Sequence, residues 1–381
     1  MIYLDNNATT AIDPQVADVI AAEFQRGPAN PSSQHAIGRS SSDRLDDAIL
    51  RIGACLGSDL SLPGGARLIT TSGGTESNNL ALAGLAAADS PLIVSSIEHA
   101  SVIAFAQQAK KQGRPVHVLP VTPNGVVRLD ALQQTLDSLD ADQAVVSVMS
   151  ANNETGVVQP IAEVAEICRQ AGALLHVDAT QSIGKLPATV NEIPAAAITI
   201  TPHKFHGPAG VGALWIDAGI KLRPLLFGGE QQLVSRPGTE PVALILGMAK
   251  ALEMAVEKLS AVCQRMVSQR DQFEATLRRE CAGLLIHGEN EKRLPGTSCV
   301  SFAGTDRQSM LMALDFAGVA CSSGSACSSG SSPPSHVLLA MGCPDWAVES
   351  AIRFSLSRFS TDDEMADATD RICRVYNRLR S

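Results

Sequence analysis

The segment Ala173-Leu-Leu-His-Val-Asp-Ala-Thr-Gln181 and the later segment Ile198-Thr-Ile-Thr-Pro-His-Lys204 decide the fold class. Each begins as a short apolar run, which is typical of a strand buried inside a sheet. Asp178 ends the first run, and Lys204 follows the second. Open α/β sheets bind their ligands at the carboxyl ends of the strands, so we expect both side chains near a ligand.

A lysine and a carboxylate placed in this way suit pyridoxal phosphate (PLP). The lysine holds the cofactor's aldehyde as a Schiff base, and the carboxylate keeps the pyridine nitrogen protonated. Each residue also has an ordinary alternative, because Asp178 could cap a helix and most lysines lie on the surface. However, a surface lysine is rarely found between a buried strand and a glycine-rich turn such as Gly207-Pro-Ala-Gly-Val-Gly212.

The chain around these segments alternates short apolar runs with helical stretches, and several of the runs lack strict polar alternation. Such runs are typical of strands buried on both faces of a mostly parallel sheet, which predicts an α/β core. The expected strands are residues 68–70, 92–95, 116–119, 144–148, 174–177, 198–200 and 212–216.

A long helical region from Pro241 to about Cys281 separates this core from a smaller α+β unit, either as two helices or as one bent helix. We place the domain boundary near residue 256. Residues 15–255 are assigned to the large domain, and residues 1–14 with 256–381 to the small domain. The expected elements of the small domain are strands at 300–302, 319–321 and 352–355 and a closing helix after Asp362.

The bulk properties exclude several classes of protein. The net charge of −9 argues against a nucleic-acid partner, which needs clustered Lys and Arg. No apolar run approaches the length of a membrane span, and the N-terminus has no signal-peptide pattern, so we expect a cytoplasmic protein. The nine cysteines include no C-x-x-C pair, so we expect neither a disulfide framework nor a metal site.

The segment Thr71-Ser-Gly-Gly-Thr-Glu-Ser-Asn-Asn79 follows one expected strand and opens a helix. Backbone N–H groups at a helix N-terminus can bind an anion, so Gly74 and Thr75 are candidates for a phosphate site. Glycine-rich turns also occur for packing reasons alone. His99 follows the next strand and could stack on a cofactor ring, or it could be structural. Asn153 could serve the site or simply form a turn.

Taken together with further ordered motifs, these residues make the chain resemble the cysteine desulfurases of the NifS and IscS type, in the class V aminotransferase family. Those enzymes supply sulfur for nitrogen fixation and iron–sulfur cluster assembly. The resemblance covers nearly the full length of the chain. Its motifs are Tyr3-Leu-Asp-Asn-Asn-Ala-Thr-Thr10, Asn30-Pro-Ser-Ser33 with His35, residues 71–79, Glu98-His99, Asn152-Asn-Glu154, residues 176–181, His203-Lys204, Arg236 with Gly238-Thr239, Ser322-Ser-Gly-Ser-Ala-Cys327 and Arg353-Phe-Ser-Leu-Ser-Arg-Phe359.

The resemblance implies a PLP-dependent transferase of fold type I that acts as a homodimer on L-cysteine. Sulfur would pass to the Cys327 thiolate as a persulfide, leaving L-alanine, and then to an acceptor or cluster-scaffold protein. The implied roles are Lys204 as Schiff-base lysine, Asp178 at the pyridine nitrogen, His99 on the ring, Gln181 at the phenolic oxygen, Asn153 near that oxygen and the substrate, Thr75, Thr201 and His203 at the phosphate, Thr239 at the neighbouring subunit's phosphate, and Arg353 at the substrate carboxylate.

Three other functions compete with this interpretation. A selenocysteine lyase, or another PLP-dependent enzyme that eliminates at the β-carbon, would not need Cys327. A sulfur carrier or regulator could keep the fold without turnover, although Lys204, Asp178 and Cys327 argue against it. A cysteine-ligated metal protein is disfavoured by the absence of close ligand pairs. A second thiol, Cys321, is expected to be a buried strand-end cysteine rather than a resolving thiol.

Overall fold

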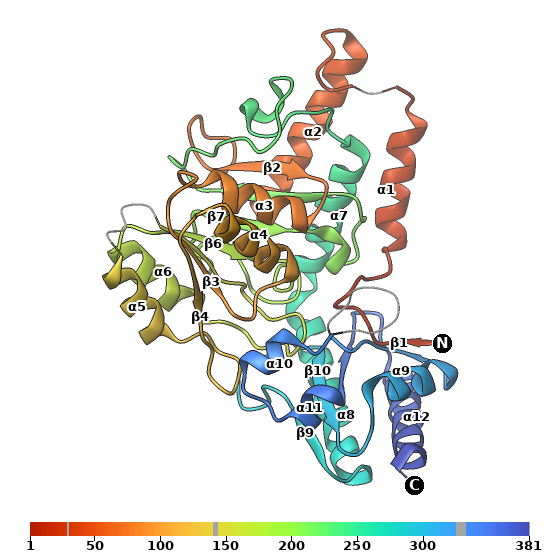
Figure 1. Ribbon diagram of the computed structural model, residues 1–381. Coiled ribbons are helices and arrows are strands. Elements are labelled where there is room, and N and C mark those ends of the chain that lie inside the picture. Colours follow the sequence, from red (N-terminus) through yellow and green to blue (C-terminus); the bar gives the residue numbers. More distant parts are fainter. Residues whose placement is uncertain (29, 140–143, 325–332, 381) are drawn as a thin grey trace.

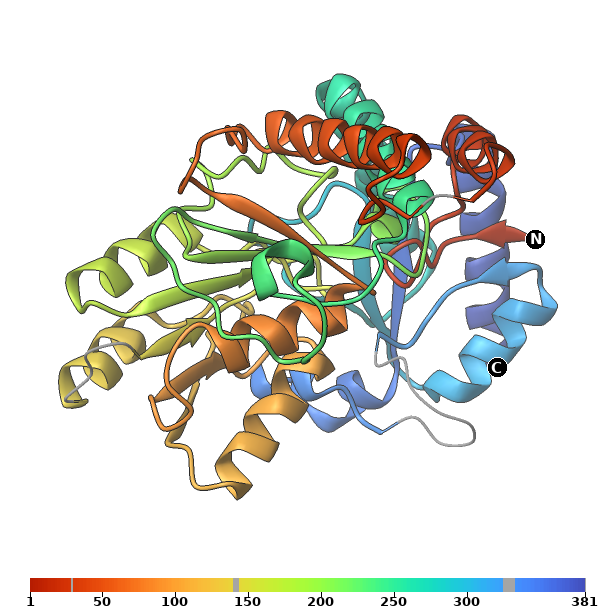
Figure 2. The same cartoon turned by 90° about the horizontal axis from the view of Figure 1, so that it is seen from above.

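The computed structural model describes residues 1–28, 30–139, 144–324 and 333–380. A seven-stranded sheet forms its centre, with α-helices on both faces (Figures 1 and 2). The strands, in spatial order, are β2 (Arg67–Thr71), β8 (Gly212–Ile216), β7 (Ala197–Ile200), β6 (Leu174–Asp178), β5 (Val145–Ser147), β3 (Leu92–Ser95) and β4 (Val116–Leu119). The five strands from β7 to β4 are parallel, and β8 runs antiparallel to both of its neighbours. The mostly parallel α/β core is confirmed.

Helices cover both faces of the sheet because successive side chains of a strand point to opposite sides. In β3, Ile93 joins the core beneath one set of helices, while Leu92 and Val94 join the core on the other face. The helices on the Ile93 side are α1 (Pro14–Gln25), α2 (Ala36–Cys55), α5 (Leu129–Ser138), α6 (Ile161–Gln170) and α7 (Val242–Glu257). The opposite face carries α3 (Gly74–Gly84) and α4 (Ala100–Lys111).

The C-terminal part of the chain builds a second, smaller sheet, which lies below the large one in Figure 1. It consists of β12 (Ala351–Ser355), β10 (Thr297–Phe302) and β9 (Leu284–Ile286), all antiparallel. Its helices are α8 (Leu259–Glu280), α9 (Arg307–Phe316), α10 (His336–Ala340), α11 (Asp345–Glu349) and α12 (Asp362–Arg380). The helical region after Pro241 therefore forms two helices, which meet at Lys258.

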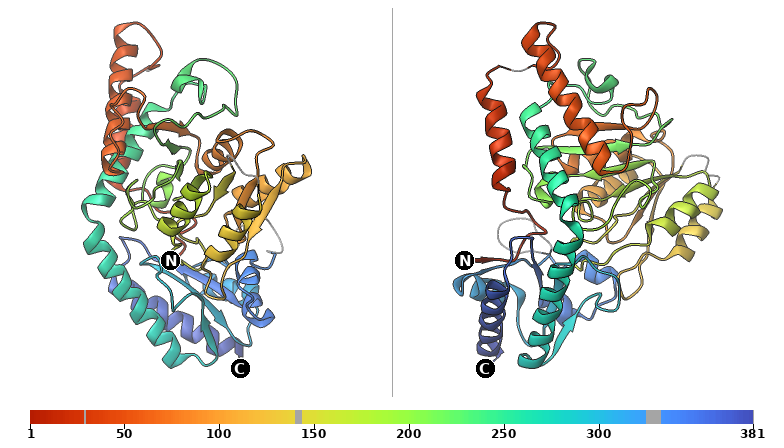
Figure 3. Two further views of the ribbon diagram at one scale, coloured as in Figure 1. Left: turned by 90° about the vertical axis from the view of Figure 1, so that its left-hand side faces the viewer. Right: turned by 180° about the vertical axis from the view of Figure 1, so that it is seen from behind.

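The N-terminal segment belongs structurally to this smaller sheet region. β1 (Ile2–Tyr3) pairs in parallel with β11 (Val319–Ala320), and Leu4 packs in the same apolar cluster as α8 and α12. The chain then crosses to α1 in the upper part of the molecule (Figure 3). The apolar core around the large sheet is a separate cluster. We therefore propose the division into residues 15–255 and residues 1–14 with 256–381.

Candidate active site

A cavity of about 620 Å³ lies at the carboxyl ends of the parallel strands, where residues of the N-terminal segment and β12 also reach it. The expected site residues come together here although they are spread over most of the chain. Ten of them line the cavity: Gly74, Thr75, His99, Asn153, Asp178, Gln181, Thr201, His203, Lys204 and Arg353.

Two expected site residues are not among the described residues that line the cavity. Cys327 lies outside the described residues, although Gly324 and Pro333, which flank the segment 325–332, line the cavity. Thr239 is exposed and does not line the cavity of its own chain. An exposed position agrees with the expectation that Thr239 serves a neighbouring subunit, but nothing in one chain tests it.

Asp178 ends β6, and its two carboxylate oxygens have different partners. Oδ1 accepts from the backbone N–H of Thr180 at 3.0 Å, so the capping-type contact considered above is present. Oδ2 accepts from Nδ2 of Asn78 at 2.7 Å. The carboxylate is thus held from both sides while it lines the cavity, which suits a fixed partner for a protonated ring nitrogen.

His99 is the N-cap residue of α4 and faces the cavity. Its Nδ1 accepts from the backbone N–H of Ser101 at 3.2 Å, so the neutral imidazole carries its proton on Nε2. The surrounding protein displaces water from the ring and thereby lowers the pKa of His99. The Ser101 hydroxyl lies 2.8 Å from Nδ1 and also accepts from Asn78, which links His99 to Asp178.

Lys204 ends the short 3-10 helix η1 (Pro202–Lys204) that follows β7. Its Nζ donates to the backbone carbonyls of Asn7 at 2.7 Å and Ala8 at 2.6 Å. The pKa of Lys204 is lowered to about 8. Burial is the largest cause, and the positive charge of Arg353 is the next. A lysine amine with so low a pKa is available as a nucleophile near neutral pH, which is the property a carbonyl-binding lysine needs.

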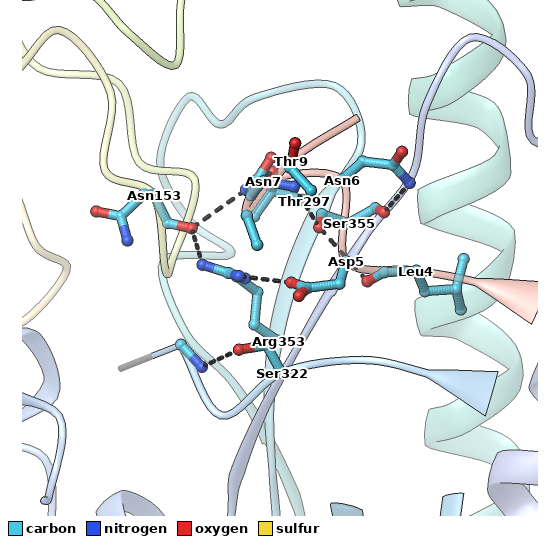
Figure 4. A network of polar contacts seen from close by, with 12 residues as sticks. Leu4, Asp5, Asn6, Asn7, Thr9, Asn153, Thr297, Ser322, Arg353 and Ser355 are labelled. Atoms are coloured by element: carbon cyan, nitrogen blue, oxygen red, sulfur yellow. Dashed lines mark hydrogen bonds and ion pairs between the residues drawn. The ribbon is translucent and has the colours of Figure 1, made fainter. Parts of the chain in front are cut away.

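Arg353 enters the cavity from β12 and is only 2% exposed (Figure 4). Nη2 donates to Oδ1 of Asp5 at 2.6 Å, and Nη1 donates to the backbone carbonyl of Asn153 at 3.0 Å. Its Nε has no hydrogen-bond partner among the described residues. The planar guanidinium is therefore fixed in place with a buried donor to spare, as a carboxylate-binding arginine should be.

The cavity also offers donors to an anion. The helix α3 begins at Gly74, its N-cap residue Gly73 has no side chain to cap it, and the N–H groups of Gly74 and Thr75 have no acceptor among the described residues, so they can bind a ligand. Thr75, Thr201 and His203 line the same cavity. A helix N-terminus that can bind a phosphate, a lysine with a lowered pKa and a carboxylate held from both sides are the three features that PLP requires, so the residues fit this cofactor.

Comparison with known proteins agrees with this geometry. The family model "Aminotransferase class-V" matches residues 2–367. A cysteine desulfurase of Trichormus azollae is 37% identical over 384 aligned residues, covering 100% of this chain and 94% of the relative. The structure of a NifS-like protein from Rickettsia africae has a TM-score of 0.90 at 31% identity, covering 99% of each chain. A structure described as SspA in complex with cysteine has a TM-score of 0.80 at 29% identity, covering 95% of this chain and 100% of the other.

This chain belongs to the cysteine desulfurase family of class V aminotransferases. The family resemblance drawn from the sequence is thus confirmed, together with the large α/β domain fold. Among the described residues, no cluster of three or more His, Cys, Asp or Glu side chains could hold a metal ion, and no helix is long and apolar enough to cross a membrane.

Several residues of this desulfurase site were not singled out from the sequence. Asp5 and Asn7 belong to the N-terminal motif, and Asn78 to the glycine-rich motif, so motif membership was the available signal. His336 lines the cavity and donates from Nε2 to the carbonyl of Glu98 at 2.9 Å. No pattern in the sequence pointed to it, because its position depends on the packing of α10 against the loop before α4.

Cys321 directly follows β11 and is half-buried, next to the apolar cluster of the small domain. The pKa of the Cys321 thiol is raised to about 12, mainly by burial. A thiol with so high a pKa is a poor nucleophile at neutral pH. This agrees with the expectation of a strand-end cysteine.

Proposed function

We propose that this protein is a PLP-dependent cysteine desulfurase that converts L-cysteine to L-alanine and collects the sulfur as a persulfide on Cys327. Membership in the cysteine desulfurase family supports the reaction class. The observation that carries the proposal is the meeting of Lys204, Asp178 and Arg353 in one cavity, which Gly324 and Pro333 on either side of residues 325–332 also line.

Each residue has a role that follows from its place. Lys204 would hold the cofactor covalently, Asp178 would face the ring nitrogen, and His99 would lie against the ring. Gln181 would donate to the phenolic oxygen, with Asn153 nearby. When bound, PLP supplies an electron sink that stabilises negative charge on the substrate carbon. Thr75, Thr201 and His203 would bind its phosphate, together with the first backbone N–H groups of α3.

The substrate is held at its carboxylate by Arg353, whose fork of N–H groups matches two oxygens. The Lys204 amine, once released, moves a proton at the substrate's α-carbon. The Cys327 thiolate then attacks the substrate sulfur. A sulfur–sulfur bond forms, the carbon–sulfur bond breaks, and the electron pair of that bond stays with the carbon, which becomes the methyl group of alanine after it takes up a proton.

The proposal is tested by measuring alanine and sulfide formed from L-cysteine, in the presence of PLP and a thiol reductant, for the wild type and for Cys327→Ala. Equal amounts of the two products from the wild type, and neither from the variant, are expected. Activity retained by Cys327→Ala would instead assign direct elimination, as in a selenocysteine lyase. No activity in either protein would favour a carrier or regulator.

We also propose that the protein acts as a homodimer in which Thr239 reaches the partner's phosphate site. Large apolar side chains stay exposed on α1, α2 and the loop before Thr239, which fits a face covered by a second copy. They include Phe24, which is 67% exposed, Ile37, which is 56% exposed, and Phe227, which is 89% exposed. Sedimentation of the wild type and of Phe227→Asp tests this, because the variant is expected to shift toward monomer.

The product sulfur is proposed to pass to an acceptor or cluster-scaffold protein in the cytoplasm, in support of iron–sulfur cluster assembly or another pathway that consumes sulfane sulfur. A persulfide suits such transfer, because an acceptor thiol can take its outer sulfur by ordinary thiol exchange. Incubation of the protein, loaded with radioactive sulfur, with a candidate scaffold would show the transfer directly.

A further inference from the structure

A second lysine, Lys185, lies four residues beyond Gln181 in the turns that follow β6. It is half-buried, and its Nζ donates to Oε1 of Gln181 at 2.7 Å and to Oδ1 of Asn7 at 3.2 Å. It forms no ion pair with a carboxylate among the described residues. A charged amine that is partly removed from water without a carboxylate partner is costly, which favours its neutral form.

The charge state of Lys185 fits these two contacts. The pKa of Lys185 is lowered well below the usual range. Burial is the largest cause, and the nearby positive charges of Lys204 and Arg353 lower the pKa further. A neutral amine has two N–H groups and a lone pair, and the two acceptors match the two N–H groups. In its neutral form the amine can donate to both side-chain amides without carrying a charge into the site.

The contact with Lys185 fixes the orientation of the Gln181 amide. Because Oε1 accepts from Lys185, the amide nitrogen must lie on the other side of the group. There Nε2 donates one hydrogen to the backbone carbonyl of Asn7 at 3.0 Å. The second hydrogen has no partner among the described residues, and Gln181 lines the cavity. The Asn7 carbonyl also accepts from Lys204, so the free N–H lies close to the catalytic lysine.

We propose that Lys185 is a positioning residue, which holds Gln181 Oε1 so that the amide N–H faces the cavity and donates to the phenolic oxygen of PLP. The inference rests on the proposed function, because it takes the ring orientation from the proposed roles of Lys204 and Gln181. Without Lys185 the amide oxygen loses its partner and only the contact of Nε2 with the Asn7 carbonyl still orients the group, so the N–H is held less firmly toward the phenolic oxygen.

The expected consequence is spectroscopic. An N–H donor stabilises the phenolic oxygen most in the deprotonated form of the bound cofactor, and so it lowers the pH at which the absorbance of the bound cofactor changes. Losing a hydrogen bond to a charged group should raise this midpoint by about one pH unit. The other titratable or charged groups around Lys185 are Lys204, Arg353, His203 and His206, together with Lys258, Cys263 and Arg358, which line a second cavity with it.

The test is an absorbance titration of the PLP-loaded protein between pH 6 and pH 10 for the wild type, Lys185→Met, Gln181→Met and the double variant. We expect both single variants to raise the midpoint by about one unit, and the double variant to be no higher than Gln181→Met. Such non-additivity means that Lys185 acts through Gln181. Lys258→Met is the matched control, since Lys258 is exposed and contacts neither amide, and it should keep the wild-type midpoint.

Two results would overturn the inference. One is an unchanged midpoint in Lys185→Met. The other is a shift of full size when Lys185→Met is added to Gln181→Met, which would mean that Lys185 acts on the cofactor by charge alone. If Lys185→Met does not fold, the same cycle is run with Lys185→Gln, whose amide ends one atom short of the lysine amine. A wild type that binds no PLP through Lys204 would instead overturn the proposed function, and the inference with it.

Discussion

Arg353 Nη2 and Asp5 Oδ1 lie 2.6 Å apart, and this ion pair joins residues from opposite ends of the chain. Asp5 follows β1 while Arg353 belongs to β12, and an isolated bridge between Asp5 and Ser355 holds the two segments side by side (Figure 4). The pair occupies one nitrogen of the guanidinium and leaves Nε without a partner among the described residues. The N-terminal motif thereby orients the proposed substrate-binding arginine.

Replacing Arg353 by lysine should impair the binding of L-cysteine more than any later step. A lysine keeps the positive charge but offers a point donor in place of a planar fork. The loss of a charge-assisted hydrogen bond predicts a KM about 10- to 100-fold higher, with a smaller change in kcat. Steady-state alanine formation measures both constants. Arg265→Lys, which changes an exposed arginine on α8, serves as the control, and an unchanged KM in Arg353→Lys would contradict the proposed role.

The lowered pKa of Lys204 predicts how the cofactor-free protein takes up PLP. Only the neutral amine attacks an aldehyde, so the rate of PLP capture should rise with pH and level off above a midpoint near pH 8. Stopped-flow absorbance after mixing with PLP, at pH values from 7 to 10, gives this profile. A rate that keeps rising to pH 10, as for an ordinary lysine, would show that Lys204 is not perturbed. Lys204→Ala should show no covalent capture.

The raised pKa of the Glu98 carboxyl predicts that the stability of the protein depends on pH. This carboxyl is fully buried beside Ser95, and burial is the main cause that raises its pKa to about 8 from an ordinary value of 4.5. Between these two pH values the folded state keeps the proton of Glu98, whereas the unfolded state has lost it. The contribution of Glu98 to stability is therefore fully present below about pH 4.5 and is lost as the pH rises toward 8. Stability should therefore fall across this interval.

Glu98→Gln removes this titration while keeping an acceptor for the Ser95 hydroxyl. We expect the variant to match the wild type near pH 5 and to exceed it at pH 8 by roughly 3–4 kcal/mol in the free energy of unfolding. Urea unfolding at both pH values measures the difference. A constant difference between the two proteins at pH 5 and pH 8 would mean that Glu98 is ionised in the folded state.

Cys321 should be dispensable for sulfur mobilisation. Its thiol has a pKa of about 12 and lies against the apolar cluster of the small domain, so Cys321→Ser is expected to retain the wild-type rate of alanine formation within about twofold. The assay is alanine release with a thiol reductant present. Loss of turnover in Cys321→Ser, without loss of folded protein, would restore the interpretation of Cys321 as a resolving thiol.

The sequence could predict the large sheet because its strands are continuous apolar runs that end in polar residues at the ligand site. It was less exact where a run was short or flanked by further apolar residues. The strand expected at 144–148 is only Val145–Ser147, and the strand β9 (Leu284–Ile286) was not foreseen. Such short strands are stabilised by their neighbours in the sheet rather than by their own sequence.

The site could be predicted as a set of residues but not as a network. Motifs located the lysine, the carboxylate and the arginine, while the contacts that orient them come from residues far away in sequence. The Asn7 carbonyl, which accepts from both Lys204 and Gln181, can be found only when the N-terminal segment is placed against η1. Lys185 resembles any surface lysine until its surroundings are known.

The most direct test of the central claim is the mass of the protein after one turnover. The PLP-loaded wild type is mixed with one equivalent of L-cysteine without a reductant, and the Cys327-containing peptide is then analysed by mass spectrometry after alkylation. We predict one additional sulfur atom on Cys327, formed in equal amount to alanine and absent from Cys327→Ala. Alanine formed without a sulfur adduct on Cys327 would contradict the proposal.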